Sequence, residues 1–112
     1  MRWHTFSQRE RTAQLRAFVD VCRALSAAFE AHGEQGHAAF KNMAVEGERL
    51  LDIGFSQPAL TAVARHFPAD PDWLNPKALD AGLPFEPWQE AVTPTYQRAR
   101  SLALDLRTLS RR

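Results

Sequence analysis

A helix near the start of the chain decides the fold, and it is encoded by residues 7–33, SQRERTAQLRAFVDVCRALSAAFEAHG. Ser7 and Glu10 have the spacing of a capping box, in which the hydroxyl accepts from the third amide of the helix and the carboxylate reaches back. Five apolar residues then recur at spacings of three and four, which places them on one helix face: Leu15, Phe18, Cys22, Leu25 and Phe29. His32-Gly33 suits the end of a last turn. We therefore predict an amphipathic helix over residues 8–31.

Two further helices are expected in the middle of the chain. The first covers residues 37–52, and Gly47 lies in line with its apolar face. Because glycine weakens a helix by about 1 kcal/mol relative to alanine, its position there indicates close approach of a neighbouring helix. Ser56 with Pro58 in the first turn predicts the start of the next helix, which covers residues 57–67 and ends at Pro68.

The last helix has a clear end and an ambiguous start. Its apolar stripe continues to about residue 110, and Thr93-Pro94 is a good start signal. Trp88 and Val92 extend the same stripe backwards in steps of four residues, however. The sequence is therefore equally consistent with a helix from residue 94 and with one helix from Pro87 that is kinked at Pro94.

A long connection rich in proline and tryptophan precedes this last helix. Six of the seven prolines lie between Pro58 and Pro87, and the segment also holds large apolar side chains: Trp73, Leu74, Leu79, Leu83, Phe85 and Trp88. We expect these side chains to anchor the connection on the bundle. The alternative is that Trp73, Phe85 and Trp88 form an apolar patch for a protein partner, since tryptophan is favoured at the centres of interfaces. Long ordered connections are often functional, which keeps this alternative open.

The fold class that follows is all-α, a small bundle of three to four helices in a single domain over residues 1–112. The net charge of +1 gives no general reason to expect nucleic acid or an acidic membrane as a partner. Cys22 is the only cysteine, so no internal disulfide can form, and no apolar run suits a signal peptide or a membrane span. A cytoplasmic protein is expected. The bias to twelve arginines against two lysines, with many alanines, is typical of a GC-rich bacterial genome.

The most specific polar pattern is a register of arginines on the first and last helices. Arg9, Arg16 and Arg23 are seven residues apart, and Arg100 and Arg107 repeat that interval. If the two helices pack side by side, their stripes could merge into a basic surface for the phosphates of RNA, DNA or another polyanion. The simpler interpretation is an ordinary solvated helix surface, and we favour it because Glu30 continues the first stripe with the opposite charge.

Catalytic and metal-binding patterns are scarce. His32, Glu34 and His37 around the first interhelical turn are the one set that could hold a divalent metal, but their spacing matches no helical ligand pair. No Glu-x-x-His motif of di-metal bundles, no nucleophile elbow and no glycine-rich phosphate loop occurs. Glu46 with Arg49 fits an ordinary surface ion pair. Cys22 lies on the apolar stripe, where a thiol is usually a small buried hydrophobe.

These observations favour a non-catalytic protein that needs no cofactor or metal and acts by binding another protein, including a second copy of itself as a homodimer. Nucleic-acid or polyanion binding through the arginine stripes is the first alternative. A metal-dependent enzyme built on the histidine turn is a more remote one. No membrane partner is expected.

Overall fold

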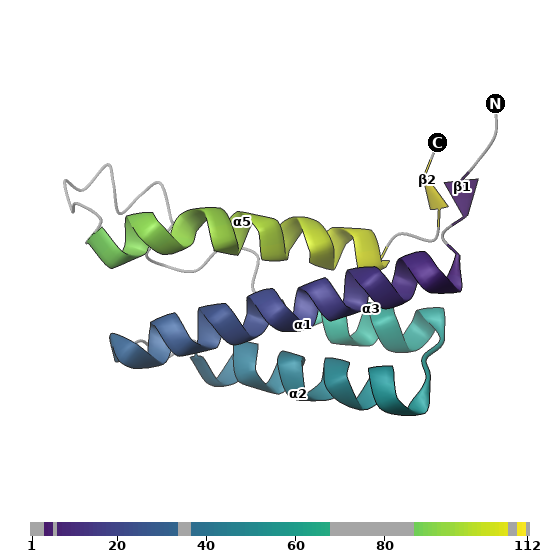
Figure 1. Cartoon of the computed structure of the whole chain (residues 1–112), viewed down its shortest axis with the longest axis horizontal. Coiled ribbons are helices and arrows are strands. Elements are labelled where there is room, and N and C mark those ends of the chain that lie inside the picture. The colour runs from purple at the N-terminus through teal and green to yellow at the C-terminus, as the bar shows by residue number, and fades with distance from the viewer. Residues whose placement is uncertain (1–3, 6, 34–36, 68–86, 108–109, 112) are drawn as a thin grey trace.

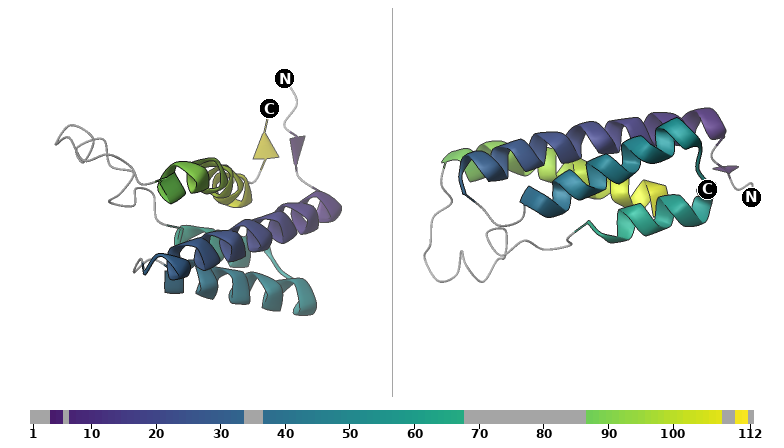
Figure 2. Two further views of the ribbon diagram at one scale, coloured as in Figure 1. Left: turned by 60° about the vertical axis from the view of Figure 1, so that its left-hand side comes forward. Right: turned by 90° about the horizontal axis from the view of Figure 1, so that it is seen from below.

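The computed structural model describes residues 4–5, 7–33, 37–67, 87–107 and 110–111. Its helices are α1 (Gln8–Ala31), α2 (His37–Ile53), α3 (Gln57–Arg65) and α5 (Pro87–Arg107). They run alternately up and down: α1 packs against α2 and α5, while α3 packs against α5 and α2 (Figure 1). The views in Figure 2 show the same four helices from the side and from below, with α3 much shorter than its neighbours. The all-α bundle predicted from the sequence is confirmed.

Helix α1 has the bounds and the cap that its sequence predicts. The Glu10 amide donates to Ser7 Oγ at 3.1 Å, and the Ser7 amide donates to Glu10 Oε1 at 3.2 Å, which completes the capping box. At the other end His32 is the C-cap, and Gly33 takes a φ of +70°, a conformation that residues with a side chain rarely adopt. Local chemistry therefore fixes both ends of this helix.

The core lies along the axis of the bundle and is rich in aromatic rings. All five residues of the predicted stripe on α1 are buried. The Phe67 ring lies at the centre of the packing, with centroid distances of 6.2 Å to Phe18, 5.7 Å to Phe40 and 5.2 Å to Tyr96. Phe67 follows α3 directly, so this one side chain joins the end of α3 to the three other helices.

The predicted end of α3 is wrong by two residues. The helix stops at Arg65 rather than at Phe67, and the amides of His66 and Phe67 donate three residues back, to Val63 and Ala64. Proline disfavours helical backbone in the residue before it. Phe67 therefore leaves the helix in a tight turn and its ring enters the core.

Helix α5 is continuous across Pro94, which selects the single-helix alternative. It begins at Pro87 and ends at Arg107, three residues short of the predicted end. Pro94 is exposed and removes one internal amide donor from the helix. One residue earlier, the Thr93 hydroxyl donates to the Gln89 carbonyl at 2.7 Å.

Gly47 lies where α2 meets α1. A Cβ at this position would lie 2.5 Å from Val19 Cγ2, closer than such atoms come in real structures. The close approach that the glycine indicates is thus confirmed, and Val19 of α1 is the neighbour responsible.

A buried polar cluster joins α1, α3 and the end of α5. The Arg11 guanidinium, 6% exposed, donates to the Asp105 carbonyl at 2.7 Å, to Gln57 Oε1 at 2.7 Å and to Gln14 Oε1 at 3.0 Å. Gln57 Nε2 in turn donates to the Leu106 carbonyl at 2.7 Å. Both carbonyls belong to the last turn of α5, where no helical amide remains to pair with them. Side chains from two other helices therefore cap α5.

The two ends of the described chain meet beside this cluster. The short strands β1 (His4–Thr5) and β2 (Ser110–Arg111) pair antiparallel, with His4 opposite Arg111 (Figure 1). Within the ranges that the structure describes, no helix is both long and apolar enough to span a membrane. The predicted folding of the connection over the bundle concerns residues 68–86, which lie outside the described residues.

Candidate functional site: a groove between α2 and α3

A groove of about 710 Å³ lies between α2 and α3. This volume falls in the range of typical ligand pockets. Nine residues line the groove: Ala39, Asn42, Met43, Glu46 and Arg49 from α2, and Ala59, Ala62, Val63 and His66 from α3. The α2 residues recur at helical spacing over about 15 Å of helix, because each residue advances about 1.5 Å. The groove therefore runs lengthwise between the two helices.

Small side chains keep the groove open. Met43 and Val63 are 2% and 3% exposed and form its floor, where they also belong to the core. Ala39, Ala59 and Ala62 line the walls and carry nothing beyond a Cβ, so they leave space between the two helices. The result is an apolar trough whose walls would allow another backbone to come close.

An ion pair neutralises one end of the groove. Arg49 Nε donates to Glu46 Oε2 at 3.0 Å, and Arg49 Nη2 contacts Glu46 Oε1, so the guanidinium grips the carboxylate at two points. Hydrogen bonding to Arg49 lowers the pKa of Glu46, and the same hydrogen bond raises the pKa of Arg49. The surface pair expected from the sequence is confirmed, and the two charges cancel at this rim.

Polar side chains line the other end of the groove. Asn42 and His66 are exposed, and neither side chain forms a hydrogen bond with any residue that the structure describes. An amide and an imidazole can each donate or accept. This end can therefore orient a bound group without selecting for charge.

All five arginines of the predicted stripes are exposed. Arg9 and Arg16 flank a shallow depression on α1 together with Asp20, whereas Arg23 forms an ion pair with Glu48 of α2. Asp20 is thus an acidic neighbour of Arg9 and Arg16 in the first stripe. Arg23, at the other end of the stripe, is directed toward α2. Because α1 and α5 are packed antiparallel, Arg9 and Arg107 belong to the same end of the bundle (Figure 1).

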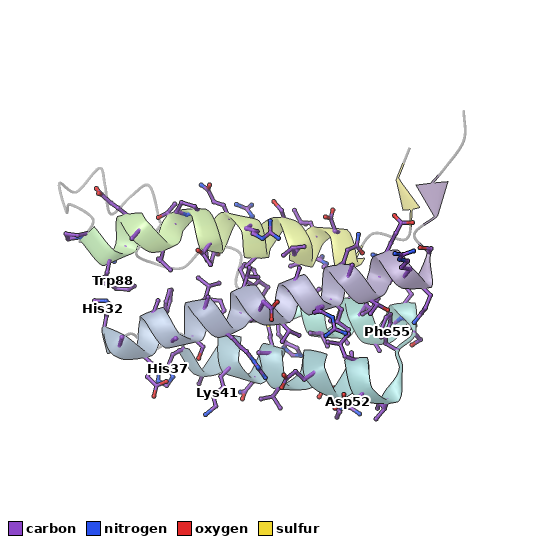
Figure 3. All side chains as sticks on the ribbon, viewed as in Figure 1. His32, His37, Lys41, Asp52, Phe55 and Trp88 are labelled. Atoms are coloured by element: carbon purple, nitrogen blue, oxygen red, sulfur yellow. The ribbon has the colours of Figure 1, made fainter. Side chains whose placement is uncertain are left out.

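The partner-binding residues predicted in the connection are only partly described. Trp73 and Phe85 lie outside the described residues. Trp88, in the first turn of α5, is partly buried and stacks face to face on His32, with the ring centroids 4.4 Å apart and the planes 5° from parallel (Figure 3). It also meets Phe29 edge to face at 5.8 Å. Trp88 thus anchors the start of α5 to the end of α1.

The histidine turn is not assembled into a cluster in the described part of the chain. His32 is engaged by the Trp88 ring, His37 lies at the start of α2, and Glu34 lies outside the described residues. No group of three or more potential metal ligands occurs among the residues described. Cys22 is fully buried, and this burial raises the pKa of its thiol to about 12, as suits a small hydrophobe in the core.

Two features of the structure were not predicted from the sequence, the burial of Arg11 and the groove, and the first of them left the clearer signal. Arg11 lies four residues before Leu15, in line with the apolar stripe of α1, so its burial could have been predicted from its position. The groove left only a weak signal, in the alanines at positions 39, 59 and 62. Alanine is common on exposed helix surfaces because of its high helix propensity, so these residues point to a groove only once α2 and α3 are placed together.

Comparison with known proteins adds no relative. No protein-family model matches the chain, and no curated protein or solved structure is significantly similar to it.

Proposed function

We propose that this chain acts without catalysis by binding another protein, and that the α2–α3 groove receives an amphipathic helix of that partner. The groove itself is the observation that carries the proposal, because it is a trough with an apolar floor and polar ends that runs between two helices. Laying the apolar face of a helix into such a groove is a recurring mode of peptide recognition.

The chemistry of the lining indicates what the partner helix carries. Buried Met43 and Val63 form the floor and exclude water from apolar side chains that enter the groove. The alanine walls favour small or medium apolar side chains at positions i, i+3, i+4 and i+7 of the incoming helix. Since Glu46 and Arg49 cancel each other at the rim, binding should depend weakly on salt.

A selection of helical peptides tests this proposal and does not require the partner to be identified. The chain is immobilised, a library of displayed helical peptides is selected on it, and the enriched peptides are titrated by fluorescence anisotropy at low and high salt. We expect enriched sequences with apolar residues at helical spacing and an affinity that changes little with salt. Amide chemical shifts should move at Ala39, Asn42 and Ala62.

The matched variants are Ala62→Trp, which fills the groove, and Ala24→Trp, which adds the same ring at an exposed position of α1 outside it. Peptide binding should be lost in the first variant and kept in the second. Peptides that bind both variants equally well would contradict the proposal, as would a library that yields no enrichment on the folded wild-type chain.

Polyanion binding is the second candidate, and one observation favours it. The antiparallel packing of α1 and α5 brings the two arginine-rich ends of the chain together, with Arg9 and Arg107 exposed at one end of the bundle and Arg111 paired across from His4. A labelled RNA or DNA oligonucleotide should then bind with an affinity that falls steeply with salt, with a slope of about −0.9 per phosphate contact on duplex DNA. Replacing Arg9 and Arg16 by alanine should flatten that slope.

We place this activity in the cytoplasm. The support is the composition of the chain, which has one buried cysteine and so gains nothing from an oxidising compartment.

A further inference from the structure

We infer that the outward face of α2 pairs antiparallel with the same face of a second copy of this chain. The face consists of Ala38, Lys41, Val45, Glu48 and Asp52, which recur at spacings of three and four residues. This is the spacing at which two helices pack along a common seam. The face borders α1 on one side, where Lys41 and Val45 line a shallow depression with Glu30 and where Glu48 pairs with Arg23. Ala38, Lys41, Val45 and Asp52 are exposed, and Val45 keeps 56% of its surface in solvent.

The charges on α2 indicate that the partner of this face is a second copy of the chain. Three of the five charged side chains on the helix are in ion pairs, Glu46 with Arg49 and Glu48 with Arg23. The remaining two, Lys41 and Asp52, form no ion pair with any residue that the structure describes. They have opposite signs, and eleven residues, or about 16 Å of helix, separate them. Figure 3 shows both on the edge of α2 that faces away from α5.

A two-fold axis perpendicular to α2 would give both Lys41 and Asp52 a partner of opposite charge. If the second helix runs antiparallel and the axis passes between positions 46 and 47, Lys41 lies opposite Asp52 of the partner subunit, and the symmetric pair forms as well. Val45 then lies opposite the stem of Glu48 of the partner subunit. Shifting the pairing by three residues so that Val45 faces its own copy would move Lys41 about 4.5 Å along the helix away from Asp52 of the partner subunit and leave both charges without a partner. Charge complementarity therefore favours the first register.

This interface goes beyond the proposed groove. Successive helix residues diverge by about 100°, so Met43 and Glu46 in the groove point well away from Val45, whereas Arg49 at the groove rim lies about 40° from it. The two surfaces therefore adjoin at Arg49, and the buried floor of the groove lies outside the interface. Two helices in contact bury less surface than a standard protein interface, and the charge pairs are exposed. We expect a weak, reversible dimer that dissociates as salt rises.

Reversing one charge at a time provides the test. Sedimentation velocity over a series of concentrations at low salt should show the wild-type chain shifting from 12.7 kDa toward twice that mass. Lys41→Asp puts two carboxylates opposite each other, and Asp52→Lys puts two ammonium groups opposite each other, so each variant alone should remain a monomer. An equimolar mixture of the two variants should dimerise again, because every contact in the mixed dimer joins opposite charges.

Asp20→Lys is the control, since it makes the same change at an exposed position of α1 away from the face and should leave the dimer intact. Circular dichroism should show that all variants keep the wild-type fold. A wild-type chain that is monomeric at every concentration would overturn the inference. So would single variants that dimerise like the wild type, or a mixture that stays monomeric. Peptide binding in the groove is measured separately, so either proposal can fail alone.

Discussion

Arg11 is a buried cation on a helix whose other arginines face solvent. Its guanidinium holds a carbonyl of α5 and the amide oxygen of Gln57 on α3, so a single side chain from α1 links three helices. Burial lowers the pKa of Arg11, and the attraction of Asp105 and Glu10 partly offsets this. A positive charge at the C-terminal end of α5 also suits the dipole of that helix. The group is therefore matched to its site both electrostatically and by hydrogen bonding.

Removing this group should destabilise the bundle strongly. We expect Arg11→Ala to lower the free energy of unfolding by about 2–3 kcal/mol, because hydrogen bonds to a charged group are lost and buried acceptors stay unpaired. The measurement is urea denaturation followed by circular dichroism. Arg9→Ala, two residues away and exposed, should change stability by about 0.5 kcal/mol or less. Equal losses in the two variants would show that the buried cluster contributes nothing.

Cys22 gives a second prediction at this scale. Its thiol pKa rises from an ordinary value of 9.0 to about 12 in the folded chain. The unfolded thiol therefore ionises first as pH rises. Stability should be independent of this group below pH 9 and should fall between pH 9 and about pH 12. At pH 8 the folded thiol should not react with Ellman's reagent, whereas in urea it should react fully. Cys22→Ala should show less alkaline destabilisation, and rapid reaction of the native thiol would contradict the burial.

Gly47 of α2 packs directly against Val19 of α1. A methyl group at position 47 would collide with Val19, whose branched side chain has little freedom to move aside. Overpacking costs about 1–3 kcal/mol, against a gain of about 1 kcal/mol in helix propensity. We expect Gly47→Ala to destabilise the chain by about 1 kcal/mol.

The same substitution should stabilise the chain in a Val19→Ala background, where the collision is absent and the propensity gain remains. Urea denaturation of the four chains completes a double-mutant cycle. If the two substitutions are simply additive, the close approach is not what selects glycine at this position.

The sequence predicts those parts of the elements that depend on local chemistry. The capping box of Ser7 and Glu10 and the glycine at position 33 fix α1 to its observed bounds. The end of α3 was predicted less accurately, because burial of the Phe67 ring in the core competes with continuation of the helix. The continuity of α5 across Pro94 was also undecided, since it depends on packing against α1 and α3 rather than on the residues around the proline.

At the scale of the whole molecule, prediction was limited to the fold class. The groove between α2 and α3 exists only because two helices meet at walls of alanine, and no single helix carries that information. The outward face of α2 is different, because its spacing and its charges can be read from the sequence of one helix. The structure adds that Glu46 and Glu48 are in ion pairs, whereas Lys41 and Asp52 form none with the residues that it describes.

The two proposals combine into one assembly. A dimer through α2 would present two equivalent grooves related by the two-fold axis. A partner that is itself dimeric could occupy both, and its second helix would then bind at a high effective concentration. Even if each groove has a low affinity for a single helix, such a dimeric partner would bind tightly.

The pairing of β1 with β2 has a practical consequence for engineering. Because His4 and Arg111 lie on adjacent strands, a short glycine-serine linker can close the backbone without crossing the bundle. New ends could then be opened directly after Gly33, where a positive φ already interrupts the helical path. A circular permutant of this kind would keep every helix intact and would move any attached fluorophore or affinity tag from the arginine-rich end to the opposite end of the molecule.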